Sequence, residues 1–232
     1  MNVMRACGRE ISGKLYFKAS CCLLIVQLLV VIPGGYSFAA EKADIQAMTQ
    51  YANDNLMKIL NSIPEGEEEH YGFYNRNELE QTALGIPYQE YDLEKEQPTG
   101  YWRIPVMVDG ENRSLLRLKN TAEGLKFSGL GGAELARNLG DHENNMVNQG
   151  KSLGTGRIVR DYSMRCDYVQ FNQKQGAKLS GTVYPLWSAT RFISAFGDNG
   201  RAAVEDYAGY DLNSIKEMRL KAREMRGEPI SF

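Results

Sequence analysis

The spacing of apolar residues divides the chain into segments with different predicted structure. In residues 43–63, apolar residues recur at steps of three and four, which predicts an amphipathic helix that ends at Pro64. Residues 77–84 are expected to form a short capped helix, with Gly85 at its C-terminal end. After Ile86 the period changes to two, which is typical of strands. Strands are predicted at 88–93, 101–108 and 112–119, and a fourth follows Glu123-Gly124 through Leu125 and Phe127.

The second half of the chain is predicted to contain a helix, further strands and two more helices. Gly131-Gly132 leads into a helix, and the Asn- and Gly-rich segment 140–156 after it predicts an exposed loop. Residues 157–171 and 179–186 are expected to be strands. Residues 187–196 are expected to form a helix with Trp187, Ile193 and Phe196 on its apolar face.

The last predicted helix has the strongest end signals in the sequence. Ser214 and Glu217 have the spacing of a capping box, and Gly227 and Pro229 supply the stop. The helix is rich in Lys and Arg, so one interpretation is a peripheral membrane protein held by this helix. The other is a helix packed on the domain with its basic residues in solvent.

These elements predict an α+β fold with a mostly antiparallel sheet built from hairpins and with helices packed on one face. The strongest hairpin signal is Asp109-Gly110, because a type I′ turn needs positive φ at both central residues. The strands lie close together in sequence, and no βαβ alternation predicts a doubly wound parallel sheet.

The first 39 residues predict export. Basic residues precede an uncharged apolar stretch over 19–35, and Ser37-Phe38-Ala39 supplies small residues for cleavage before Ala40. The apolar core is short for a membrane span, so cleavage is favoured over an uncleaved anchor, and no stable membrane insertion is expected after it. We therefore predict a signal peptide over 1–39, a single globular domain over 40–232, and a periplasmic or extracellular location.

The net charge and the cysteine content limit the expected partners and the expected disulfides. The whole chain has a net charge of −2, and losing the basic leader makes it more acidic, so nucleic acid is not an expected partner. Of the four cysteines, only Cys166 lies outside the predicted leader, so no intrachain disulfide is expected.

Cys166 is the candidate nucleophile for an alternative function, a cysteine-dependent hydrolase that pairs it with a histidine. The two histidines, His70 and His142, lie in acidic segments, and acidic surroundings raise a thiol pKa. Cys166 also alternates with Met164 and Tyr168 like a buried strand residue. A non-catalytic cysteine is therefore favoured. The sequence leaves open whether the chain is an enzyme, and a non-enzymatic role is favoured.

No metal or cofactor is expected. His70 follows three glutamates, and His142 lies between Asp141 and Glu143, but neighbouring side chains do not converge on one ion and neither cluster has zinc-site spacing. Gly129-Leu130-Gly131-Gly132, at a predicted helix start, is compatible with anion binding and equally with a simple strand-to-helix turn.

Four aromatic residues near the first strands are the candidate ligand-binding residues: Tyr88, Tyr91, Tyr101 and Trp102. Aromatic side chains in a hairpin-rich region can line a groove for a ligand or peptide. They are also common as core and edge residues of a sheet.

Several segments resemble a recurring pattern in secreted bacterial proteins of unassigned function. The similar segments are 72–79, 83–88, 102–110 and 113–116, together with 157–171 and 183–186. Such segments occur alone or ahead of papain-like cysteine peptidase modules. The shared motifs are turns, glycines and strand apolars, and they name no catalytic residue. The resemblance implies an exported accessory or binding domain and leaves the ligand open. The leading hypothesis is an exported, non-catalytic domain that binds a protein, peptide or small ligand, and an exported protein or peptide is the candidate partner.

Overall fold

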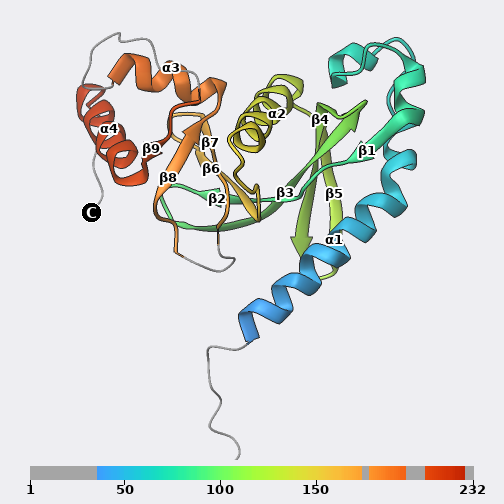
Figure 1. The fold of residues 1–232 in the computed structure, drawn as a ribbon, viewed down its shortest axis with the longest axis horizontal. Coiled ribbons are helices and arrows are strands. Elements are labelled where there is room, and N and C mark those ends of the chain that lie inside the picture. The colour runs from blue at the N-terminus through green and yellow to red at the C-terminus, as the bar shows by residue number, and fades with distance from the viewer. Residues whose placement is uncertain (1–35, 174–177, 197–206, 228–232) are drawn as a thin grey trace, which may run out of the picture.

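The computed structural model describes residues 36–173, 178–196 and 207–227 (Figure 1). Residues 1–35, most of the predicted signal peptide, lie outside this range. The predicted cleavage point before Ala40 falls near the start of the first helix, α1 (Tyr36–Leu60). Among the described residues, no helix combines the length and the apolar character needed to cross a membrane.

One sheet organises the described part of the chain, in the order β5-β4-β3-β2-β6-β7-β8-β9, with β1 paired to β3. The helices besides α1 are η1 (Glu68–Tyr71), η2 (Arg76–Gln81), α2 (Ala133–Asn148), α3 (Trp187–Phe196) and α4 (Leu212–Met225). The strands are β1 (Thr82–Leu84), β2 (Tyr88–Asp92), β3 (Gln97–Val108), β4 (Glu111–Thr121), β5 (Gly124–Gly131), β6 (Gly156–Asp161), β7 (Cys166–Gln170), β8 (Thr182–Pro185) and β9 (Tyr210–Asp211).

The predicted α+β class is confirmed, because every strand pair of this sheet is antiparallel except β2 with β6. The β3–β4 hairpin forms at the predicted turn, where Asp109 has φ 52° and Gly110 has φ 81°. Both residues therefore adopt the left-handed backbone that the turn requires.

Helices cover both faces of the sheet, which refines the predicted arrangement. Alternate residues of β4 point to opposite faces. Leu116 and Leu118 join the core cluster beneath α1, whereas Leu115 joins the cluster beneath α2. The helices α3 and α4 pack over Val159 and the β6–β7 half of the sheet. Figure 1 shows them at the opposite end of the molecule from α1, with α2 between.

The structure corrects two predicted elements near the middle of the chain. The predicted loop 140–156 is helical as far as Asn148, because His142 and Met146 lie on the buried face of α2 and their burial stabilises the additional turns. The predicted single strand 157–171 is a β6–β7 hairpin. Its turn includes Arg165 at φ 56° and no glycine or proline, so the usual sequence signal for a turn is missing.

The ends of the short helices also differ from the predictions. The short helix near residue 80 is a 3₁₀ helix capped by Asn75, and β1 follows it directly. The cap of α4 is Asp211, whose side chain accepts from the Asn213 N–H, rather than Ser214. Trp187 was predicted on the apolar face of α3 but is 53% exposed, because Ala189, Phe192 and Ile193 form the buried face.

Candidate functional site

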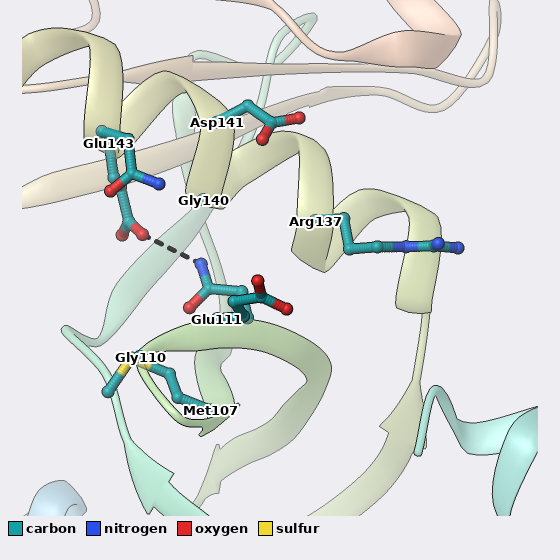
Figure 2. A pocket seen from close by; sticks show the side chains of 9 residues that line it. Met107, Gly110, Glu111, Arg137, Gly140, Asp141 and Glu143 are labelled. Carbon is teal, nitrogen blue, oxygen red and sulfur yellow. Dashed lines mark hydrogen bonds between the residues drawn. The ribbon is translucent and has the colours of Figure 1, made fainter. Parts of the chain in front are cut away.

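A polar cavity of about 300 Å³ lies between the β3–β4 hairpin and the middle of α2 (Figure 2). The hairpin supplies Met107, Gly110, Glu111 and Asn112, and α2 supplies Arg137, Gly140, Asp141, Glu143 and Asn144. We call this the hairpin cavity. It lies at the low end of the size range of small-molecule pockets, so it suits a single functional group or side chain.

Glu143 is the carboxylate with the most fixed position in the hairpin cavity. Its Oε1 accepts a hydrogen bond of 2.5 Å from the Tyr88 hydroxyl, and its Oε2 accepts one of 2.9 Å from Asn112 Nδ2. The dashed line in Figure 2 marks the second bond. Because Tyr88 and Asn112 are buried on two strands, the sheet itself sets the carboxylate's position.

The surroundings of Glu143 favour its protonated form. Burial raises the pKa of this carboxyl group, and the hydrogen bonds from Tyr88 and Asn112 offset only part of the rise. Burial, together with the neighbouring Glu143 charge, also raises the pKa of Tyr88, so the phenol remains a donor. A perturbed carboxyl group in a cavity is a common mark of a functional site.

Gly140 lets α2 come close enough to β4 to form the cavity. A Cβ at this position would lie 3.1 Å from Asn112 Nδ2 and 3.4 Å from Asn112 Cβ. A larger residue would crowd Asn112, which would have to shift by a few tenths of an ångström at the point where it donates to Glu143.

Acidic side chains outnumber basic ones in the lining of the hairpin cavity. Glu111 and Asp141 are exposed at its rim, and Glu143 is half-buried. Arg137 is the one cation of the lining, and it forms no ion pair with the described residues. Figure 2 shows its side chain extending away from Glu143.

Arg137 also borders a second cavity of about 270 Å³, which we call the Tyr74 cavity. There the Arg113 guanidinium lies 4.3 Å from the centre of the Tyr74 ring and pairs with Glu111 at 2.9 Å and Glu78 at 3.5 Å. Tyr74 is 62% exposed. An exposed aromatic ring therefore lies beside the acidic cavity, on the far side of Arg137.

The four predicted aromatic residues do not share one surface. Tyr88, Tyr91 and Trp102 are buried in three separate core clusters. Tyr101 is partly exposed, with the Arg117 guanidinium 3.7 Å from its ring centre. Only the hydroxyl of Tyr88 reaches the hairpin cavity, through Glu143.

Cys166 lies in the core, as its alternation with Met164 and Tyr168 predicts. It is 2% exposed, and its thiol contacts the carbonyl oxygens of Met164 and Ser188. Burial, reinforced by Asp161 and Asp167, raises the pKa of the thiol to about 12. A thiol with this pKa carries almost no nucleophilic thiolate at neutral pH.

Neither histidine contacts Cys166 within the described ranges. His142 lies on the buried face of α2, where its Nε2 lies 3.1 Å from the Pro185 carbonyl oxygen, and burial lowers its pKa. His70 is exposed on η1, against the ring of Tyr71. The part of the chain that the structure describes contains no cluster of three or more metal-ligating side chains.

The sequence signal for the hairpin cavity is present but is obscured by the predicted loop. Arg137, Gly140, Asp141 and Asn144 recur at steps of three and four, which places them on one helix face. The predicted helix ends near Gly140, so the sequence alone presents Glu143 only as a neighbour of His142. Its contact with Tyr88 spans 55 residues and has no local signal.

No protein-family model, curated protein or solved structure matches the chain.

Proposed function

We propose that this chain is an exported, non-catalytic binding domain, and that its hairpin cavity receives a cationic side chain of a protein or peptide partner. The observation that carries the proposal is the lining itself, where three acidic side chains lie with one guanidinium. Glu111 already pairs with Arg113 at 2.9 Å, whereas Asp141 and Glu143 have no ion pair with the described residues. Charged groups arranged to complement a partner give specificity and faster association. A lysine ammonium is small enough for the cavity and donates hydrogen bonds to carboxylate oxygens.

The fixed position of Glu143 supports a binding role. Tyr88 and Asn112 hold the carboxylate before any partner arrives, so little side-chain entropy is lost when it accepts a further hydrogen bond. The exposed Tyr74, on the other side of Arg137, supplies apolar area next to the charged group. Tyrosine is among the residues that contribute most to binding energy at protein interfaces.

The burial of Cys166 argues against the alternative of a cysteine-dependent hydrolase. The thiol is inaccessible, it has a raised pKa, and no histidine contacts it among the described residues. A nucleophilic cysteine needs a base or cation that lowers its pKa. Here the charged neighbours are Asp161 and Asp167, which act in the opposite direction.

The ion pairs of α4 argue against a membrane-bound basic helix. Arg219 is buried and pairs with Asp161 at 3.1 Å and Glu94 at 2.7 Å. Lys216 pairs with Glu96 at 2.5 Å. These basic residues are therefore neutralised within the fold, and the prediction that they lie in solvent is wrong for Arg219.

Titration calorimetry with trilysine tests the proposal, with trilysine acetylated on its side chains as the uncharged comparison. We expect saturable heat for trilysine only, and binding weaker by about tenfold or more in an Asp141→Asn/Glu143→Gln double variant, since tenfold corresponds to about 1.4 kcal/mol. Glu123→Gln, an exposed glutamate outside the lining, is the matched control and should bind normally.

Two results would overturn the proposal. One is equal binding of the acetylated and unmodified peptides. The other is an equal loss of binding in the double variant and in Glu123→Gln, because general attraction to an acidic protein would then explain the heat.

A further inference from the structure

A third cavity, of about 280 Å³, lies at the N-terminal end of α2 and shares no lining residue with the hairpin cavity. Its lining combines Arg103, Leu115 and Arg117 with the continuous segment from Ser128 to Gly132. We call it the glycine cavity. Its chemistry is independent of the proposed function.

Two guanidinium groups that line the glycine cavity share a single carboxylate. Arg103 Nε lies 2.8 Å from Glu90 Oε2, and one terminal nitrogen of Arg117 lies 3.2 Å from Glu90 Oε1. Glu90 is fully buried, and it also accepts a hydrogen bond of 2.5 Å from Tyr162. The two arginines therefore bring one more positive charge than Glu90 neutralises.

The next charges on this face do not remove that surplus. Arg160 pairs with Asp167 at 3.6 Å, so these two residues balance each other. Burial raises the pKa of Asp167, which favours its neutral form. The group of three guanidiniums and two carboxylates thus keeps a net positive charge.

Arg103 retains hydrogen-bonding capacity toward the glycine cavity. Its side chain is 8% exposed, and Nε is the nitrogen that bonds to Glu90. Among the described residues, the hydrogen bond of this side chain is made by Nε and not by its two terminal nitrogens. The Nε of Arg117 is buried and has no hydrogen-bond partner among the described residues. Buried donors without partners are costly, so a ligand that accepts from them is favoured.

The backbone beside the two arginines is shaped for a small anion. A Cβ on Gly129 or Gly131 would meet no atom within 4 Å, so both glycines border open space. Gly132 is the N-cap of α2 and provides no side-chain cap for the first N–H groups of this 16-residue helix. The N-terminus of a helix attracts anions through these N–H groups and the helix dipole.

We infer that the glycine cavity binds an oxyanion group, a phosphate or a carboxylate. The Arg103 and Arg117 guanidiniums donate to it from the sheet, and the N–H groups at the start of α2 donate from the helix. The glycines leave room for its oxygen atoms to approach the backbone.

Nuclear magnetic resonance titration of the ¹⁵N-labelled chain with inorganic phosphate, and separately with acetate, tests this inference. We expect saturable shifts of the amide signals of residues 129–134, and the anion that binds more tightly identifies the ligand class. Gly129→Val should abolish these shifts, because the new side chain enters open space from a backbone without positive φ.

Arg117→Gln is a second variant that keeps Arg103 and its bond to Glu90, and we expect it to weaken anion binding by about tenfold. Lys119→Gln is the matched control, because Lys119 also lies against the Tyr101 ring but does not line the cavity. The inference is wrong if neither anion gives saturable shifts. It is also wrong if the Arg117 and Lys119 variants lose the same affinity.

Discussion

Glu90, on β2, and Glu143, on α2, each accept a hydrogen bond from a tyrosine hydroxyl, yet their surroundings differ in charge. Glu90 is fully buried and faces the guanidiniums of Arg103 and Arg117. Burial alone would raise its pKa, but the charges of Arg103 and Arg117 and the hydrogen bonds from Tyr162 and Arg103 together outweigh burial and lower it. Glu143 has no cationic partner among the described residues, so burial prevails and its pKa is raised.

The comparison separates a structural carboxylate from one that is available to a ligand. The charge of Glu90 is used within the protein, where it compensates for two arginines. Glu143 receives neutral donors only, and its side chain lines a cavity. A partner that brings a positive charge would supply for Glu143 what Arg103 supplies for Glu90.

The largest effect is expected from Glu90→Gln. Removing one member of a buried ion pair leaves the other charge uncompensated, which costs about 3–5 kcal/mol. Urea unfolding should show this loss in the free energy of unfolding. Glu123→Gln, at an exposed position, should change it by less than about 0.5 kcal/mol. A loss below about 1 kcal/mol for Glu90→Gln would place this group in the class of surface ion pairs.

A smaller effect is expected from Tyr88→Phe. The substitution removes the hydroxyl that donates to Glu143, and leaving a buried acceptor without its donor costs about 1–3 kcal/mol. The paired variant Tyr162→Phe removes the corresponding hydroxyl donor from Glu90. Tyr162 is exposed, however, and Glu90 keeps its ion pairs with both arginines. Urea unfolding should therefore show a smaller loss for Tyr162→Phe. Equal losses would mean that the two arginines beside Glu90 do not make it less dependent on its tyrosine hydroxyl than Glu143 is.

The smallest effect, and the most informative dependence on pH, is expected from Glu143→Gln. The folded-state pKa of Glu143 is raised, so its contribution to stability is fully present below about pH 4.5 and is lost as pH rises through the folded-state pKa. Glutamine cannot ionise, so the variant should lack this loss, with a free energy of unfolding within about 1 kcal/mol of the parent.

Unfolding curves measured across the acidic and neutral range check the sign. Glu90 acts in the opposite direction, because its lowered pKa gives stability above about pH 4.5 that is lost as pH falls through the folded-state pKa. If Glu143→Gln is destabilised most at neutral pH, the carboxylate is stabilising in its charged form and the comparison fails.

Local patterns predicted the parts of the fold that depend on local physics. The Asp109-Gly110 turn requires positive φ at both residues, and this requirement is visible in two letters of sequence. The alternation of Cys166 with Met164 and Tyr168 predicted its burial, because alternate residues of a strand point to the same face. The helical stretch beyond Gly140 was missed because glycine and asparagine are poor helix formers, whereas burial of His142 and Met146 overrides that preference.

The candidate site needed contacts that local patterns do not contain. Tyr88 was predicted as a ligand-binding aromatic, yet its ring is buried and its hydroxyl alone reaches the cavity. Its partner Glu143 lies on a helix that starts beyond three intervening strands. The network around Glu90 likewise joins residues from β2, β3 and β4 with Tyr162, and only the completed sheet brings them together.

The parallel pairing of β2 with β6 also sets an order of events during folding. The β3–β4 hairpin closes across two residues, whereas Tyr88 must find Gly156, which lies beyond β3, β4, β5 and α2 in the chain. Closing a long loop costs more entropy, and contacts distant in sequence slow folding. We therefore expect the strands β2 to β5 to assemble first. During synthesis, β2 then keeps one edge unpaired until β6 has emerged, which is the interval in which another chain can add to that edge.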